Sequence, residues 1–306
     1  MRTLCLSFLL LGCTPPADTG PTDSGPHDTG SEDTGPDDTG PDDTGEPPAC
    51  VPDGDGRVSF EEFLADPALG IVATYSTNEA GTTVPVSGLA GLDQGDGSRA
   101  WDFSSVNPGT DTTWDVRLQA PGGTWFAGYF PTATYYVGLD SSERILGAYR
   151  LDPDVEQLQL LGMATAEEAE GGVLIYERPV VVFDFPLALG QTWEADAVQA
   201  DGHWEGEDYP ADFGWAGVVT LEHSYAFEVD AHGRLAVPLG EFDVLRLRLD
   251  QRMEAVNSIS GVFGSEAFIA YFYVAECAGL VARVRSVEGE READFTEASE
   301  YLRLGF

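Results

Sequence analysis

The feature that most constrains the fold is the alternation of apolar and polar residues in short segments from residue 70 onward. In residues 218–230, apolar side chains such as Tyr225 and Phe227 fall on one face of an extended chain, and polar ones such as Glu228 fall on the other. A period of two residues is typical of a half-buried strand. Further runs of this kind cover residues 70–76, 99–106, 113–119, 125–130, 133–139, 144–151, 156–161, 173–184, 191–199, 242–249, 266–275, 279–287 and 299–304.

Helical patterns are scarce, at residues 60–65 and at residues 164–170. The sequence Asp-Ala-His-Gly at 230–233 predicts a hairpin turn into a short strand at 234–238. We therefore expect an all-β fold, a large antiparallel sandwich or curled sheet with one short N-terminal helix, forming a single domain over residues 50–306. An α+β half-barrel of the lipoprotein-carrier type is the alternative.

The charge of the chain excludes several classes of partner. Its 306 residues include 53 Asp and Glu and 15 basic residues, all arginine, for a formal net charge of −38. Residues 51–306 alone hold 43 acidic residues and 14 arginines, a net charge of −29. Such a surface repels phosphate backbones and anionic lipid headgroups, so we expect no nucleic-acid binding and no basic membrane patch.

Residues 14–49 carry an acidic repeat. A triplet Asp-Thr-Gly or Asp-Ser-Gly begins every five residues from Asp18 to Asp43, and the segment has no large apolar side chain. It cannot offset the entropy of ordering itself, which predicts a disordered tether. The fixed Asp spacing also suggests a Ca²⁺ array, but calcium repeats need stacked apolar residues that this segment lacks.

The N-terminus has the pattern of an export signal. Arg2 precedes a short apolar run that is too short to span a bilayer. The sequence Leu10-Leu11-Gly12-Cys13 resembles the lipobox of bacterial lipoproteins. This resemblance implies cleavage of residues 1–12, lipidation of Cys13 and attachment to the outer membrane through the lipid alone. The alternative is an ordinary secretory signal in which Cys13 has no role.

Cys50 and Cys277 are the two cysteines that remain after Cys5 leaves with the signal and Cys13 takes a lipid. In an oxidising compartment they are expected to form a disulfide. Two separately buried thiols are the alternative.

Residues 51–62, Val-Pro-Asp-Gly-Asp-Gly-Arg-Val-Ser-Phe-Glu-Glu, resemble an EF-hand loop. The resemblance implies a Ca²⁺ site formed by Asp53, Asp55, the carbonyl of Arg57, Ser59 and Glu62. Val51 departs from the pattern, because the first position normally carries an aspartate, so a water or a carboxylate from elsewhere would complete the shell. The alternative is that Ser59 and Glu62 form a capping box of a short helix at 60–65.

The segment 201–217 is long for a hairpin connection and combines aromatic with acidic residues. Long loops are more often functional than short ones. Its candidate ligand residues for a sugar or a cation are Trp204, Glu205, Asp208, Tyr209 and Trp215. In the alternative interpretation these aromatic residues cap one end of the sheet core.

Three segments together resemble a recurrent β-rich domain of uncharacterised bacterial envelope lipoproteins. They are FPLALGQTW at 185–193, VPLGEFDVLR at 237–246 and AGLVAR at 278–283. The resemblance implies a fold and an envelope location over about residues 120–306, but no activity.

The chain shows no hydrolase elbow, zinc-protease motif, phosphate loop or dinucleotide fingerprint. His223 falls on the apolar face of its strand, which favours a hydrogen-bonded core histidine. We expect a non-enzymatic, lipid-anchored envelope protein with a structural or binding role, with Ca²⁺ as the cofactor to test. A carrier of an apolar ligand and a carboxylate-based hydrolase are the alternatives, and a protein, a glycan and an apolar ligand all stay open as partners.

Overall fold

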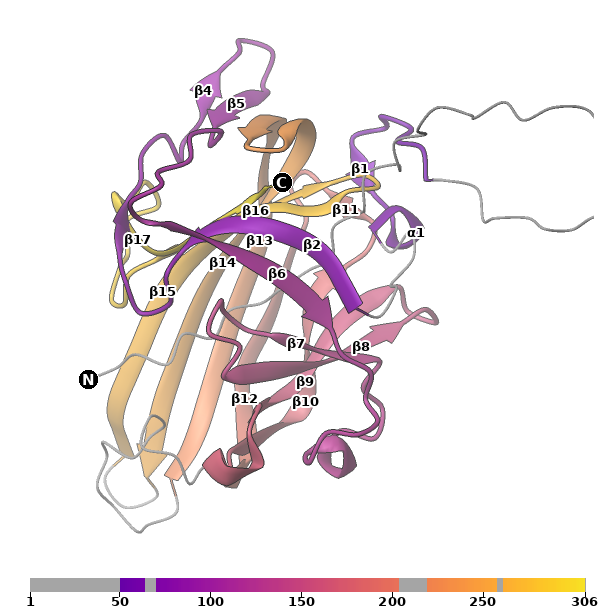
Figure 1. Ribbon diagram of the computed structural model, residues 1–306, viewed down its shortest axis with the longest axis vertical. Helices are drawn as coiled ribbons and strands as arrows, with labels where there is room; N and C mark the ends of the chain where they lie inside the picture. Colours follow the sequence, from indigo (N-terminus) through magenta and orange to yellow (C-terminus); the bar gives the residue numbers. More distant parts are fainter. Residues whose placement is uncertain (1–49, 64–69, 204–218, 258–260, 306) are drawn as a thin grey trace, which may run out of the picture.

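The computed structural model describes residues 50–63, 70–203, 219–257 and 261–305 (Figure 1). The helical segments are α1 (Phe60–Phe63), η1 (Ala127–Tyr129) and η2 (Glu168–Glu170). The strands are β1 (Arg57–Val58), β2 (Gly70–Asn78), β3 (Val84–Pro85), β4 (Leu92–Asp93), β5 (Arg99–Asp102), β6 (Asp111–Leu118), β7 (Tyr135–Gly138), β8 (Ile145–Asp152), β9 (Gln157–Thr165), β10 (Val173–Asp184), β11 (Leu187–Ala188), β12 (Thr192–His203), β13 (Val219–Val237), β14 (Gly240–Asn257), β15 (Gly261–Ala275), β16 (Gly279–Ser286) and β17 (Glu297–Leu304).

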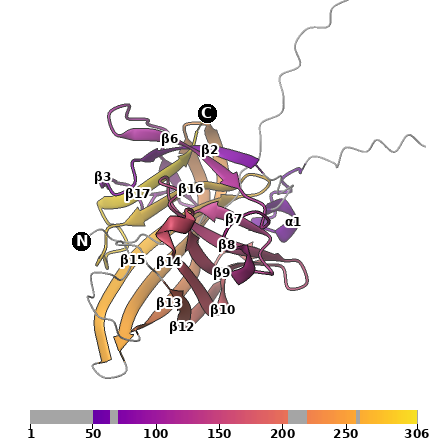
Figure 2. The ribbon, with the colours of Figure 1, turned by 60° about the horizontal axis from the view of Figure 1, so that its bottom comes forward.

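Most of these strands belong to one curled antiparallel sheet. Its main order is β6-β2-β17-β16-β15-β14-β13-β12-β10-β9-β8-β7, and β3, β4 and β5 branch from it. The two ends of this order meet, because the backbone N–H groups of Gln119 and Tyr136 each donate to the other residue's carbonyl at 2.9 Å. Figures 1 and 2 show the strands wrapped around a common interior. The prediction of an all-β fold with a curled sheet is confirmed.

The longest strands, β13, β14 and β15, follow the predicted alternation. Tyr225 and Phe227 are each 2% exposed, whereas the side chain of Glu228, which points to the opposite face of the strand, is exposed. Because successive side chains point to opposite faces of a sheet, this pattern places the apolar set inside the curl. No helix among the described residues is long and apolar enough to cross a membrane, and none has the length that the α+β alternative requires.

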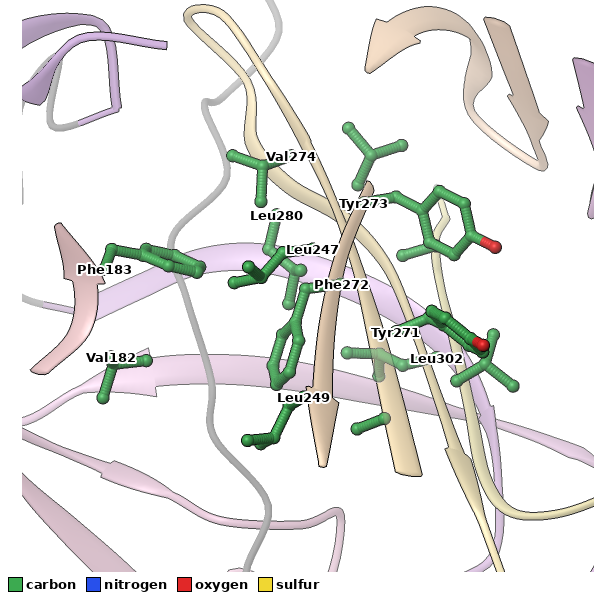
Figure 3. Close-up of a cluster of buried hydrophobic side chains, with 14 of the residues drawn as sticks. Val182, Phe183, Leu247, Leu249, Tyr271, Phe272, Tyr273, Val274, Leu280 and Leu302 are labelled. Atoms are coloured by element: carbon green, nitrogen blue, oxygen red, sulfur yellow. The ribbon is translucent and has the colours of Figure 1, made fainter. Parts of the chain in front are cut away.

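Part of the interior is filled by apolar side chains from facing walls of the curl. Figure 3 shows Phe272, Leu247 and Leu249 on one side and Phe183 and Val182 on the other. The ring centroids of Phe183 and Phe272 lie 6.4 Å apart in an edge-to-face arrangement. Close contact of this kind joins the two walls into a sandwich-like core.

The outer face of β15 is also covered. Tyr273 points away from Phe272 in Figure 3, and its ring packs against Trp101 and Phe103 at centroid distances of 5.2 and 5.4 Å. The segment around β5 therefore forms a second layer over this part of the sheet.

The predicted hairpin turn at residues 230–233 is wrong. β13 runs without a break to Val237, with a register shift between Val229 and Ala231, and the turn into β14 lies at Val237–Gly240. Such a shift marks a β-bulge, which bends a strand without ending it. β5 pairs in parallel with this part of β13, and Gly233 lies opposite Arg99 in that pairing.

Two further local predictions are wrong. Residues 125–130 form no strand, since they contain η1, and Trp125, Phe126 and Phe130 gather with Tyr136 on the outside of the sheet. Residues 164–170 form no α-helix, since β9 continues to Thr165 and only the short η2 follows. In both cases the pattern was too short to separate a strand or helix from a packed turn.

The N-terminal part of the domain is attached to the sheet at two places. β1 pairs with β11 in a separate two-stranded sheet, and the rings of α1 residue Phe63 and of Phe183 meet at 5.1 Å. Cys50 and Cys277 are joined as predicted, with Cα atoms 5.5 Å apart. The disulfide fixes the start of the described chain to the turn between β15 and β16.

Candidate cation site and adjoining groove

The loop before α1 is held in shape by its own aspartates. Asp53 Oδ1 accepts the backbone N–H of Asp55 at 2.9 Å, and Asp55 Oδ1 accepts that of Arg57 at 2.8 Å. Gly54 lies between the two aspartates and Gly56 follows Asp55, with φ values of 68° and 79°, a conformation that glycine adopts without a steric penalty. The Asp-Gly-Asp-Gly sequence therefore forms a tight turn with both carboxylates on the surface.

Glu62 caps the N-terminus of α1 and does not join these two carboxylates. Its Oε2 accepts the backbone N–H of Ser59 at 2.8 Å, and the Ser59 hydroxyl oxygen accepts the backbone N–H of Glu62 at 3.2 Å. These reciprocal hydrogen bonds are a capping box, which satisfies N–H groups at the start of a helix. The structure thus confirms the capping alternative for Ser59 and Glu62.

A third carboxylate arrives from the far end of the chain. Asp53, Asp55 and Glu276 each offer one oxygen, and the three oxygens lie within 4.8 Å of one another. Glu276 Oε2 also accepts the backbone N–H of Gly54 at 3.0 Å. The sequence analysis did not identify Glu276. The expected disulfide between Cys50 and Cys277 could have indicated it, because that bond brings Glu276, the neighbour of Cys277, close to the loop.

Of the predicted calcium ligands, the structure brings together Asp53 and Asp55 and leaves out Glu62 and Ser59. The carboxylates of Asp53, Asp55 and Glu276 are close enough to share one cation, and hard Ca²⁺ prefers such oxygen ligands. Glu276 is a carboxylate from a distant part of the sequence that lies beside the loop.

A groove of about 460 Å³ adjoins this cluster and shares Glu276 with it. Its walls come from residues 56–58, from the β4–β5 hairpin and from the β13–β14 hairpin. Three arginines, Arg57, Arg99 and Arg234, line it together with Asp96, Asp243 and Glu276. The formal charges of these six side chains cancel, which makes the groove unlike the rest of a domain with a net charge of −29.

Two arginines of the groove, Arg99 and Arg234, form only long ion pairs. Arg234 lies 3.7 Å from Asp243 and 4.0 Å from Glu241, and Arg99 lies 3.9 Å from Asp93. These separations exceed normal hydrogen-bond distances. His232, predicted to lie in a turn, lines the groove from the bulged part of β13, and its Nδ1 is buried with no hydrogen-bond partner among the described residues.

His223 is a core histidine, as predicted. Its side chain is 0% exposed, and its Nδ1 lies 3.2 Å from the hydroxyl oxygen of Tyr225. Burial lowers the pKa of His223 to about 4, because the charged form loses its hydration. A neutral imidazole of this kind is suited to a hydrogen-bond network inside the sheet.

The remaining predicted site residues lie outside the described part of the chain. They are Cys13 and the loop residues Trp204, Glu205, Asp208, Tyr209 and Trp215.

Comparison with protein-family models, with curated proteins and with solved structures finds no match to this chain.

Proposed function

We propose that this chain is a lipid-anchored protein of the cell envelope whose β domain has a binding or structural role without catalysis. The Cys50–Cys277 disulfide is the observation that carries the proposal. Disulfides form and persist in exported proteins and are rare in the reducing cytosol. Together with the lipobox-like sequence at Cys13, it supports export followed by attachment through a lipid.

Metabolic labelling with an alkyne fatty acid in a Gram-negative host tests the anchor. We expect the wild-type chain to take up the label and to fractionate with membranes, and Cys13→Ser to lose both properties. Cys5→Ser is the matched control, because it removes a thiol of the same N-terminal segment without changing the attachment site. Equal labelling of Cys13→Ser and wild type would refute the anchor.

We further propose that Asp53, Asp55 and Glu276 bind Ca²⁺. The convergence of three carboxylate oxygens within 4.8 Å supports this assignment. The cluster brings together one oxygen from each of three carboxylates, whereas Ca²⁺ takes 6–8 oxygen ligands, so the affinity is expected in the range of extracellular modules, about 0.1–1 mM.

Two Glu→Gln variants distinguish this site from an EF-hand. We expect Glu276→Gln to weaken Ca²⁺ binding about tenfold in calorimetry, since it removes a charged ligand, and Glu62→Gln to leave the affinity unchanged. An EF-hand loop predicts the reverse order. Absence of binding heat at millimolar Ca²⁺, or a larger effect of Glu62→Gln, refutes the proposed ligand set.

The carrier and hydrolase alternatives have no specific observation in their favour among the described residues. The apolar half of the interior is occupied by packed side chains (Figure 3), which gives no support to the binding of an apolar ligand there.

A further inference from the structure

The side chains that line the interior of the curled sheet change from apolar to polar along the long strands. Towards the β13–β14 hairpin it is apolar, with Leu247 and Phe272 among its members (Figure 3). Farther from that hairpin the same inner face carries polar side chains that are still buried. Among them, His223 is 0% exposed and Gln251 and Arg285 are each 3% exposed.

These side chains follow one line across four neighbouring strands. His223 and Tyr225 lie on β13, Tyr225 pairs with Gln251 on β14, and Gln251 pairs with Phe268 on β15. The guanidinium carbon of Arg285, on β16, lies 3.7 Å from the centroid of the Phe268 ring. At about 4.8 Å between neighbouring strands, the line spans about 14 Å. We refer to His223, Gln251 and Arg285 as the inner polar line.

β16 brings two buried arginines, Arg283 and Arg285, into the interior, and they differ in their hydrogen bonds. Arg283 donates from Nε to Glu300 Oε2 at 2.6 Å and from Nη2 to the other oxygen of the same carboxylate. Arg285 stands opposite Glu300 in the strand register, but its Nε and Nη1 are buried without a hydrogen-bond partner among the described residues. Buried N–H groups without a hydrogen-bond partner are disfavoured in folded proteins.

Glu266 is the rival partner for Arg285 within the chain. Burial raises the pKa of Glu266, Glu288 raises it further, and Arg285 lowers it. The two side chains therefore act on each other, yet the Arg285 Nε and Nη1 stay unsatisfied. Glu266 thus leaves hydrogen-bonding capacity on Arg285 for another group.

The other two members of the line have unused atoms as well. Gln251 Oε1 and His223 Nε2 are buried without a partner in the described part of the chain. Buried polar groups in folded proteins are almost always hydrogen-bonded. The line therefore presents donors at Arg285, an acceptor at Gln251 and an imidazole nitrogen that serves as either.

We propose that the inner polar line binds a small monocarboxylate that also carries a hydroxyl group. The guanidinium of Arg285 matches a carboxylate in charge and shape. The ligand hydroxyl donates to Gln251 Oε1, the member of the line on the strand nearer to Arg285. A phosphate or sulfate brings more negative charge than one unpaired arginine balances, so a singly charged ligand fits best. This site is independent of the lipid anchor and of the carboxylate cluster at Asp53.

Three small probes test the chemistry by calorimetry on the exported chain. 3-Hydroxybutyrate has both groups, butyrate lacks the hydroxyl, and butane-1,3-diol lacks the carboxylate. We expect binding to weaken from 3-hydroxybutyrate to butyrate and to vanish for the diol. Absence of heat with millimolar 3-hydroxybutyrate, or equal binding of the diol, overturns the proposal and leaves ordered water as the partner of these atoms.

Arg285→Met and Arg291→Met form a matched pair, since both remove one arginine and Arg291 is exposed. We expect Arg285→Met to weaken 3-hydroxybutyrate binding at least about tenfold, the effect of losing a charged hydrogen bond, and Arg291→Met to leave it unchanged. Equal losses in the two variants point to a general charge effect and refute the site.

Two measurements keep the test valid should Arg285→Met fail to fold. Gln251→Leu is expected to weaken 3-hydroxybutyrate binding without changing butyrate binding. In the wild-type chain, the Nε–H resonance of Arg285 is expected to shift on addition of 3-hydroxybutyrate and to stay fixed on addition of the diol. An unmoved Arg285 resonance in a chain that binds the probe places the ligand elsewhere.

Discussion

Gly233 lies where β13 and β5 approach more closely than any side chain allows. A Cβ added at this position would fall 1.8 Å from the carbonyl oxygen of Arg99 and 2.6 Å from its backbone nitrogen. Both atoms belong to backbone that is fixed by the pairing of β5 with β13, so no rotamer change relieves the clash. We expect Gly233→Ala to destabilise the domain by displacing β5.

The size of the effect is bounded from both sides. Overpacking of a fixed site typically costs about 1–3 kcal/mol. Complete release of β5 would expose Trp101, which is 4% exposed, and burial of a tryptophan of roughly 200 Å² is worth about 5 kcal/mol. A partial shift of β5 is the cheaper response, so we expect a loss of about 2–4 kcal/mol in the free energy of unfolding.

Gly240→Ala is the control, because Gly240 has φ 158°, close to the 153° of Gly233, and no heavy atom within 4 Å of its added Cβ. It therefore carries the backbone strain without the clash. Urea unfolding followed by tryptophan fluorescence compares the two variants. If Gly233→Ala is no less stable than Gly240→Ala, the close approach of β5 has no energetic weight and the reasoning fails.

Three further predictions concern pH, the disulfide and a buried ion pair. The pKa of His223 is about 4 in the folded chain and about 6.5 in an unfolded one, so its contribution to stability is complete above pH 6.5 and about 3 kcal/mol is lost as the pH falls to 4; His223→Phe should flatten this part of the pH–stability curve measured by urea unfolding, and an unchanged slope contradicts it. Reduction of the disulfide, which closes a sequence separation of 227 residues, is expected to cost up to about 5.4 kcal/mol in the chain-entropy model; a thermal scan with and without reductant checks this, and the proposed Ca²⁺ affinity should fall with it. Glu300→Leu leaves Arg283 buried and uncompensated and is expected to cost about 3–5 kcal/mol, most of which Arg283→Met should restore in the double variant; a double-mutant cycle without such recovery contradicts the assignment.

The positions of the strands were predictable where one face of the strand is buried and the other is exposed to solvent. In β13 the alternation of Tyr225 and Phe227 with Glu228 could be recognised in the sequence, because apolar residues lie on the buried face and the charged residue lies on the exposed face. Closure of the sheet was not predictable, since the contact of Gln119 with Tyr136 joins strands whose sequences carry no mark of their partners. The alternation of residue types indicates which face of a strand is buried, whereas the choice of neighbouring strand depends on the tertiary structure.

The failure at residues 230–233 has a specific physical cause. Asp-Ala-His-Gly has the composition of a turn, but here Gly233 serves the close approach of β5, and Asp230 binds Arg246 through both carboxylate oxygens at 2.8 Å. Both roles depend on residues distant in sequence. The same residue types therefore form a bulge where local preferences alone favour a hairpin.

The candidate cation site was half predictable. Asp53 and Asp55 were identified from their spacing, whereas Glu276 enters through the fold. Glu62 was assigned to the metal by the EF-hand resemblance, although the competing capping box uses the same carboxylate. In the structure this carboxylate caps the short helix and is not part of the cluster of Asp53, Asp55 and Glu276.

The position of the disulfide decides how a pulling force would enter the domain. Tension on the segment before residue 50 passes through Cys50 directly to Cys277, at the turn between β15 and β16. It bypasses the loop at Asp53, the two-residue pairing of β1 with β11, and α1. The strands that then resist are held by β14 and β17 on either flank, so the mechanically weak N-terminal elements stay unstretched while the middle of the sheet takes the tension. Reduction of the bond would reverse this order, and the β1–β11 pairing would then be the first to separate.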